Sequence, residues 1–279
     1  MVVHRRLTRL AGNAFEISVV AGDKQWAEER IDNAVAEINR VFDLLSVSDM
    51  DSPINQINAN AGINAVKVDQ EVFNLVNRSL KISDLTRGAF DITHNYHNVI
   101  MDAKKSTIYL SEPDMQINLG SIVKGYATDR AKYVLQMQGV LSGVVNAFGD
   151  MITWGSQPGN KPWTIEDASP NQLFGGPSNL NISNMAISTL GKLEYHINDA
   201  GVMDEFVLNP KTGLPLHSFD SVSVFSPSAE LAAAMSAPVK VMGVKMSLNL
   251  FNKLNQLVCV IVNKRKKVYT SKSISLMMF

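Results

Sequence analysis

Two stretches of the sequence place an apolar residue at every third or fourth position. Residues 26–45 and 69–86 follow this spacing, which lines their apolar side chains along one face and predicts two amphipathic helices. Gly88 comes just after the second stretch, where a residue in the left-handed conformation commonly ends a helix. We therefore expect both helices to pack on a core as scaffold.

Shorter apolar or alternating runs predict strands, and segments rich in turn-forming residues separate them. The strands are expected at residues 10–20, 106–110, 115–119, 144–145, 163–165, 186–189, 221–225, 257–262 and 267–271, and at 205–215 where a strand leads into a turn. Residues 154–184 are rich in Asn, Gly, Ser and Pro and predict a surface loop. Mixed helices and strands indicate an α+β fold.

The C-terminal part of the chain predicts two more helices and a hairpin. Residues 229–243 form the first helix, which we expect to be interrupted at Pro238 because proline lacks the N–H group that an interior helical residue donates. Residues 245–254 form the second helix. The basic residues within 263–266 are expected to lie in the solvated turn of a closing hairpin.

Residues 118–131 read Asn-Leu-Gly-Ser-Ile-Val-Lys-Gly-Tyr-Ala-Thr-Asp-Arg-Ala and predict a turn that opens a helix. Backbone N–H groups at a helix start attract anions, and Lys124 lies one turn inside, where its ammonium would meet a phosphate. A diphosphate ligand is one interpretation. The other, which is commoner for such a segment alone, is an ordinary turn with a surface lysine. Neither the Gly-x-x-x-x-Gly-Lys-Ser/Thr loop nor the Gly-x-Gly-x-x-Gly turn is present.

Length and charge limit the remaining choices. With 279 residues the chain can bury a full core, and we expect one domain over residues 1–279, or two intimately packed subdomains, because no linker is visible. Lys plus Arg and Asp plus Glu both number 26, and this balance argues against a nucleic-acid-binding protein. Cys259, the single cysteine, lies in an apolar run and is expected to be a buried thiol.

The central stretch resembles D-L-G-G-I-A-K-G-Y-A-x-D-R-A, a signature of the ApbE family of FAD:protein FMN transferases. Further blocks follow in the family's order. Residues 42–58 resemble F-D-x-x-x-S…S-x-x-x-x-x-N, 87–93 resemble S-x-G-A-F-D-x-T, 144–150 resemble L-V-N-x-G-G-D, 186–189 resemble A-I-S-T-S-G, and 209–215 resemble D-P-x-T-G-x-P. The resemblance extends over residues 10–262 and identifies a divergent member.

The resemblance implies a largely antiparallel sheet with flanking helices, and Mg²⁺-dependent transfer of FMN from FAD to a protein threonine. By the same resemblance, the residues expected to contact FAD are Ala89, Phe90, Asp91, Asn118, Ser121, Lys124 and Val207. Magnesium would be held by the backbone carbonyl of Ser121 together with an Asp and a Thr of a later helix. The expected partners are FAD or a related nucleotide and an acceptor or partner protein, with no nucleic acid and no transmembrane segment.

The positions that carry the chemistry depart from the family pattern. Ala233 and Ala237 stand where the family has its magnesium-binding Asp and Thr, and Phe206 stands at the histidine suited to act as base. Neither alanine side chain can bind a hard cation, since Mg²⁺ takes oxygen ligands. Nearby oxygen-bearing side chains are Glu230 and Ser236, with Asp204 and Glu205 on a neighbouring loop. Asn118 likewise replaces an acidic residue, and Phe148 replaces a glycine.

These substitutions leave two hypotheses open. One is a transferase, or an FAD-hydrolysing relative, whose metal is held by unexpected groups. The other is a catalytically inactive family member that serves as a nucleotide-binding or protein-interaction module, and the site chemistry favours it. FAD is the expected ligand in the first hypothesis, whereas the substitutions count against Mg²⁺.

The family is commonly exported and lipid-anchored. Residues 1–6 are basic but are followed by no apolar export segment and no cysteine for lipid attachment, and no run of residues approaches the length of a membrane span. We therefore expect a cytoplasmic protein if the sequence is complete, and otherwise one from which an export segment has been removed.

Overall fold

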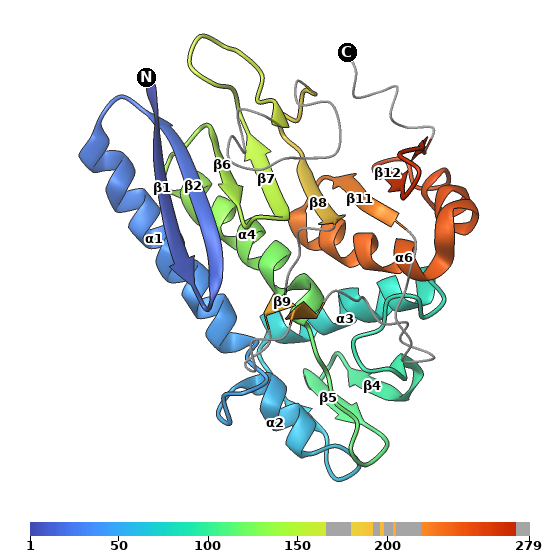
Figure 1. Ribbon diagram of the computed structural model, residues 1–279. Coiled ribbons are helices and arrows are strands. Elements are labelled where there is room, and N and C mark those ends of the chain that lie inside the picture. Colours follow the sequence, from blue (N-terminus) through green and yellow to red (C-terminus); the bar gives the residue numbers. More distant parts are fainter. Residues whose placement is uncertain (166–179, 192–195, 198–202, 205–218, 272–279) are drawn as a thin grey trace.

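The computed structural model describes residues 1–165, 180–191, 196–197, 203–204 and 219–271. Its main feature is an eight-stranded, fully antiparallel sheet in the order β1-β2-β6-β7-β8-β11-β12-β13 (Figure 1). The strands are β1 (Val2–Leu10), β2 (Asn13–Ala21), β6 (Gly143–Asn146), β7 (Asp150–Trp154), β8 (Ala186–Gly191), β11 (Phe219–Ser226), β12 (Val258–Asn263) and β13 (Val268–Thr270). This arrangement confirms the predicted α+β fold.

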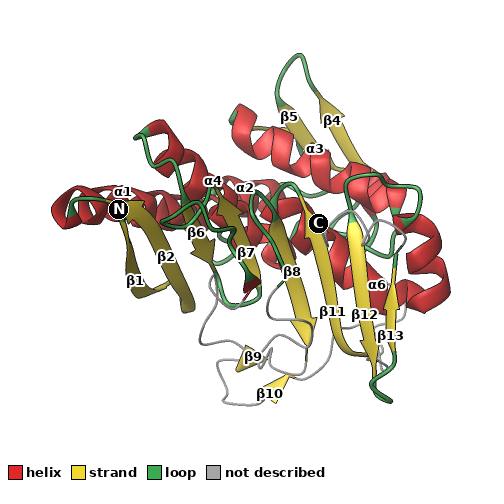
Figure 2. Ribbon diagram, turned by 90° about the horizontal axis from the view of Figure 1, so that it is seen from above, coloured by secondary structure: helices red, strands yellow, loops and turns green. Residues whose placement is uncertain are grey.

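Three helices form one layer along one face of this sheet (Figure 2). They are α1 (Lys24–Leu44), α4 (Gly120–Met137) and α6 (Ala229–Phe251). The main hydrophobic core lies between this layer and the sheet, because alternate strand residues point towards the helices. Helix α4 contacts both α1 and α6 and is therefore the central helix of the layer.

A smaller unit adjoins the start of α4. It contains a three-stranded sheet in the order β3-β5-β4, with α2 beside β5 (Figure 1). Its elements are α2 (Pro53–Ala59), β3 (Val66–Lys67), α3 (Gln70–Leu85), the 3₁₀ helix η1 (Tyr96–Asn98), β4 (Val99–Asp102) and β5 (Thr107–Leu110). A separate pair, β9 (His196–Ile197) and β10 (Met203–Asp204), completes the described elements.

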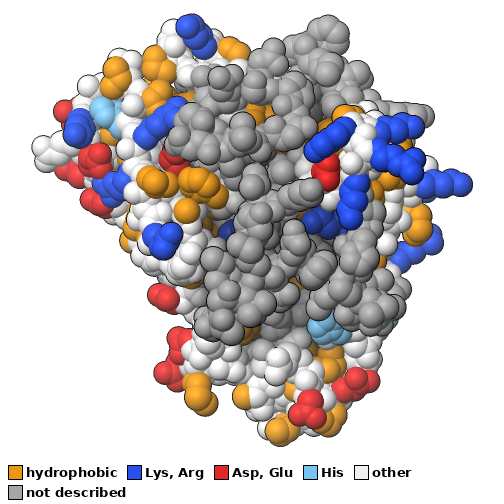
Figure 3. All heavy atoms as spheres, viewed as in Figure 1, with side chains coloured by type: hydrophobic (Ala, Val, Ile, Leu, Met, Phe, Trp, Pro, Cys, Tyr) orange, Lys and Arg blue, Asp and Glu red, His pale blue; other side chains and the backbone are white. Residues whose placement is uncertain are grey.

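The predicted amphipathic helices are confirmed as α1 and α3. Each begins after an aspartate, and Asp23 accepts a hydrogen bond from the Trp26 N–H at 2.6 Å as the cap of α1. Gly88 has φ 74°, so the left-handed ending of α3 is confirmed as well. The predicted C-terminal hairpin is β12–β13, whose basic turn is exposed, and Lys and Arg side chains gather on that side of the molecule (Figure 3).

Strand β1 was not predicted. Its three arginines and one histidine hide the alternation, although Leu10 is buried and Arg6 bonds to Glu28 and Asp32 of α1. The turn that joins β1 to β2 holds Ala11 and Gly12, both at positive φ. This is the two-residue turn that matches the twist of a hairpin.

Four sequence-based expectations need correction. Residues 115–119 form no strand but lead as irregular chain into α4, and residues 163–165 form no strand either, because Thr164 makes only an isolated bridge to Asn181. Residues 154–184 are not a simple surface loop, because Trp163 and Ile182 are fully buried in a second core on the other face of the sheet. Helix α6 runs through Pro238 and breaks instead at Gly243, where φ is 74° and ψ is 173°.

Helix α6 is also the one helix in the described ranges whose length and composition would fit a membrane span, contrary to the expectation that no segment is long enough. Core helices of soluble proteins share these properties. Helix α6 packs against α4, β8 and β11, and residues at its start, such as Ala232 and Ala234, are fully buried there.

Candidate functional site

One end of the main sheet collects most of the sequence blocks singled out above. The register pairs Glu16 of β2 with Asn146 of β6, so the β1–β2 turn and the turn at residues 147–149 lie at the same end. Asp150 of β7 pairs with Ser188 of β8 at this end too. Helix α4 contacts both β6 and β7, and Lys124 near its start interacts with Asp150, which places the start of α4 here as well.

Three segments from distant parts of the sequence meet just before α4. The side chain of Asn58 makes two hydrogen bonds to Ile117, donating to its carbonyl at 3.0 Å and accepting from its N–H at 2.7 Å. The Asn118 N–H donates to the carbonyl of Ile92 at 2.8 Å. The irregular chain at 115–119 is thus fixed by a side chain and by one backbone bond instead of by a neighbouring strand.

The first turn of α4 offers fewer free donors than the sequence predicts. The Gly120 N–H donates to Oδ1 of Asn118 at 2.8 Å, and the N–H groups of Ile122 and Val123 both donate to the Leu119 carbonyl. Ser121 and Asn118 are exposed, whereas Lys124 is half-buried. The cationic side chain of Lys124 is therefore the main source of positive charge in this turn.

A buried polar chain joins β7, β8 and α6. Asp150 is 5 % exposed, and its carboxylate hydrogen bonds to Ser188. Ser188 Oγ lies 3.2 Å from Ser236 Oγ, which donates to the Ala233 carbonyl at 2.9 Å. Burial raises the pKa of Asp150 above its ordinary value, while Lys124 and the Ser188 hydrogen bond act in the opposite direction.

Helices α4 and α6 approach each other closely beside this chain. A Cβ atom on Gly125 would lie 2.5 Å from the Ala229 carbonyl oxygen and 3.1 Å from Ala233 Cβ, so only glycine fits there. One turn further on, Asp129 accepts hydrogen bonds from the backbone N–H groups of Ala229 and Glu230 at 2.8 and 2.9 Å. Gly125 and Asp129 therefore serve the packing of the two helices.

The residues at the expected magnesium site do not fit a divalent cation. Ala233 is 3 % exposed and Ala237 is half-buried, and neither has a side-chain oxygen. Of the alternatives weighed from the sequence, Glu230 is held by Arg78 through two hydrogen bonds of 2.7 and 2.8 Å, and Ser236 is bonded to Ser188. In the described ranges no group of three or more His, Cys, Asp or Glu is placed to hold a metal ion.

The remaining predicted contacts fall into two groups. Ala89 and Phe90 are buried, and only Asp91 of that triplet is partly exposed, with its carboxylate accepting from Thr93 and from the Tyr96 N–H. Phe206, Val207 and Glu205 lie outside the described residues, as does the side chain of Asp204.

In the sequence, Asp150 and Ser188 fall within the family-like blocks at 144–150 and 186–189, and Ser236 is a nearby oxygen-bearing side chain, but nothing connects the three. The contact between Asp150, Ser188 and Ser236 depends on the pairing of β7 with β8, which turns Asp150 and Ser188 towards α6. The only signal in the sequence is the alternation of side chains along a strand. It places Asp150 on the same face of β7 as the core residue Ile152, and Ser188 on the same face of β8 as the core residue Ala186. That signal becomes usable once the two strands are known to be neighbours.

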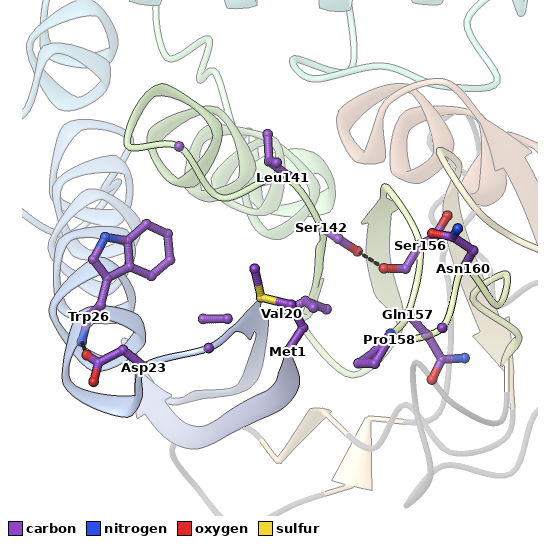
Figure 4. Close-up of a pocket in the computed structure, with 14 residues that line it drawn as sticks. Met1, Val20, Asp23, Trp26, Leu141, Ser142, Ser156, Gln157, Pro158 and Asn160 are labelled. Atoms are coloured by element: carbon purple, nitrogen blue, oxygen red, sulfur yellow. Dashed lines mark hydrogen bonds between the residues drawn. The ribbon is translucent and has the colours of Figure 1, made fainter.

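A cavity of about 670 Å³ lies at the other end of α4. It is bordered by Trp26 of α1, by Val20 and Met1, and by Leu141 and Ser142 after α4 (Figure 4). Since α4 has 18 residues, its two ends are about 27 Å apart, and this cavity is separate from the cluster around Lys124.

Comparison with protein families and solved structures agrees with the resemblance seen in the sequence. The model of the ApbE family matches residues 11–95 and 94–261. An FAD:protein FMN transferase of Klebsiella pneumoniae is 28 % identical over 223 residues, which cover 68 % of each chain. Another, from Treponema pallidum, is 24 % identical over 290 residues, covering 86 % of this chain and 80 % of the relative.

Solved structures support the fold over the whole length. The ApbE protein of Thermotoga maritima superposes with a TM-score of 0.84 at 22 % identity and covers 99 % of both chains. The apo form of the flavinyl transferase ApbE of Pseudomonas stutzeri gives a TM-score of 0.82 at 21 % identity, covering 99 % of this chain and 98 % of that one.

Proposed function

This chain belongs to the ApbE family, and on that premise we propose that it binds FAD at the start of α4. The observation that carries the proposal is the half-buried Lys124, which follows the exposed Gly120 and Ser121 at the start of α4. An ammonium in this position would bind the diphosphate of FAD, and the positive end of the helix dipole adds to the attraction.

The segments that meet before α4 support the same ligand. Asp91 and Asn118 are brought to one place by the bond between the Asn118 N–H and the Ile92 carbonyl, and both side chains are at least partly exposed. They offer a carboxylate and an amide that would bond to polar groups of the nucleotide. Recognition would thus combine one charge with a few fixed polar contacts.

Transfer of FMN to a protein is the second candidate, and the names of the curated relatives together with Lys124 favour it. In that reaction an acceptor hydroxyl forms a bond to the phosphorus of the FMN half, the bond from this phosphorus to the bridging oxygen breaks, and AMP leaves. The hydroxyl proton must go to a base. Lys124 would offset the charge on the phosphoryl oxygens, but Phe206 at the family's base position cannot accept a proton.

Titration of the purified chain with FAD, followed by flavin fluorescence, tests the first candidate. We expect saturable binding that weakens about tenfold or more in Lys124→Met, which corresponds to about 1.4 kcal/mol or more. Lys81→Met, which removes an exposed lysine of α3, is the matched control and should bind like the wild type. Absence of saturable binding by the wild type would refute the proposal.

The same samples decide the second candidate. Chromatography for AMP, in the presence and absence of a flavin-accepting protein domain, reports cleavage of FAD at the diphosphate. AMP together with a flavin-labelled acceptor would establish transfer. Bound FAD that remains intact would leave FAD binding as the function and exclude transfer to that acceptor.

A further inference from the structure

We propose that the Lys124 ammonium at the start of α4 takes the place of a divalent cation, so that this chain binds the phosphate groups of its ligand without a metal. The inference rests on the proposed FAD site and specifies which group balances the negative charge of the FAD phosphates. It is based on the hydrogen-bond partners of the carboxylates near α4 and α6, and on the position of Lys124 at the start of α4.

Each carboxylate that the described residues place near the start of α6 already has partners inside the protein. Glu230 binds Arg78 through both oxygens, at 2.7 and 2.8 Å. Asp129 accepts from two backbone N–H groups at the start of α6. Asp150 is buried and hydrogen bonds to Ser188. A divalent cation would have to displace one of these partners to gain a ligand.

The space also favours an apolar contact over a metal ligand. Ala233 packs towards Gly125, the residue that follows Lys124, and the two helices are already as close as glycine permits. Since Mg²⁺ demands near-octahedral oxygen coordination, two alanines in this position leave it without the side-chain ligands that would hold it.

Lys124 has what is needed to replace the cation. An ammonium carries a full positive charge and three donors, and these can reach the oxygens of a phosphate at the start of α4. The buried Asp150, which bonds to Ser188, is the carboxylate whose pKa the Lys124 charge lowers, so its effect on the lysine is electrostatic.

Measuring FAD affinity in Mg²⁺ and in EDTA tests the metal part. We expect dissociation constants that agree within about twofold in the two conditions. A tenfold or greater loss in EDTA, with FAD still bound in Mg²⁺, would overturn this inference and leave the proposed FAD site standing. Failure to bind FAD in either condition would overturn the proposed function and with it the ligand assigned to Lys124.

A second readout needs no FAD. Paramagnetic resonance of added Mn²⁺ reports binding of the metal alone, and the wild type should leave its signal unchanged. The variant Ala233→Asp with Ala237→Thr restores two oxygen ligands and should reduce the signal of free Mn²⁺. Stoichiometric Mn²⁺ binding by the wild type would contradict the inference whether or not the restored variant folds.

The electrostatic coupling of Asp150 to Lys124 is tested by a double-mutant cycle on thermal stability. Lys124→Met should lower Tm because it leaves a buried carboxylate without its counter-charge, and adding Asp150→Asn should recover most of the loss. Lys124→Arg, which keeps the charge, should recover part of the FAD affinity as well. Additive losses in the cycle would show that the two side chains are not coupled.

Discussion

Replacing Gly125 by alanine should destabilise the protein although alanine is the better helix former. The new Cβ would lie 2.5 Å from the Ala229 carbonyl oxygen, where ordinary contacts begin at 3.4 Å, so α4 and α6 must separate locally by 3.4 − 2.5 = 0.9 Å. The neighbour is backbone and cannot rotate away. Overpacking of this kind lowers the free energy of unfolding by about 2–3 kcal/mol, whereas the higher helix propensity of alanine raises it by about 1 kcal/mol.

The net effect is therefore a loss of about 1–2 kcal/mol in the free energy of unfolding. Urea denaturation followed by far-UV circular dichroism measures it, and the slope of the transition should stay unchanged. Ala36→Gly, at an exposed position of α1, gives the propensity term separately and should cost about 1 kcal/mol. A Gly125→Ala variant as stable as the wild type would refute the close approach of the two helices.

Further predictions concern a carboxylate, the thiol and an amide. Burial raises the pKa of the Asp129 carboxyl from 3.8 to about 6, so the folded protein binds the carboxyl proton more tightly than the unfolded chain does. This proton stabilises the fold fully below pH 3.8. The free energy of unfolding should fall by up to about 3 kcal/mol as the pH rises through 6. Urea titrations should show this decline in the wild type and its absence in Asp129→Asn; parallel pH profiles would contradict it. Burial likewise raises the pKa of Cys259 to about 12, so Ellman's reagent should react only after denaturation, and rapid reaction of the native thiol would disprove its burial. Asn58→Ala should cost about 1–3 kcal/mol by leaving both backbone groups of Ile117 unpaired, and Asn58→Asp, which keeps the acceptor, should cost less; equal losses in denaturation experiments would count against the paired geometry.

Hydrophobic spacing was sufficient to predict the elements that pack by one face. It identified α1 and α3 because their buried residues recur at helical spacing, and β12 because its apolar run is continuous. Hydrophobic spacing failed where buried side chains lie within a mostly polar segment, as Trp163 and Ile182 do. It also failed at residues 115–119, where an apolar run has no neighbouring strand to pair with. In these segments the contacts that decide the structure come from distant residues.

The candidate site was predictable residue by residue but not as an arrangement. Lys124 was identified from the turn that opens α4, and the substitutions at Ala233 and Ala237 from the family pattern. That the charge of Lys124 acts on Asp150, and that Glu230 binds Arg78, depends on strand order and on the crossing of two helices. No local pattern in the sequence encodes either contact.

The break of α6 also shows how local preference is overridden. Proline costs an interior helix about 3 kcal/mol, yet Pro238 is buried within helical backbone, so packing against the sheet offsets that cost. Gly243 takes the left-handed conformation that other residues disfavour, and the chain changes direction there. The position of the break follows from which residue can adopt the turn, and not from which residue weakens the helix.

The strands of the main sheet stand side by side in the order in which they occur along the chain. Three neighbouring pairs, β1–β2, β6–β7 and β12–β13, meet across turns of two to four residues. Strand β2 reaches β6 only across about 120 residues, an entropic cost of about 4 kcal/mol. The β1–β2 hairpin can form early from local contacts, whereas its docking must wait for α1, α3 and α4. The β1–β2 turn lies at the end of the sheet where we propose that FAD binds, and it should thus take its place late in folding, after the start of α4 has formed.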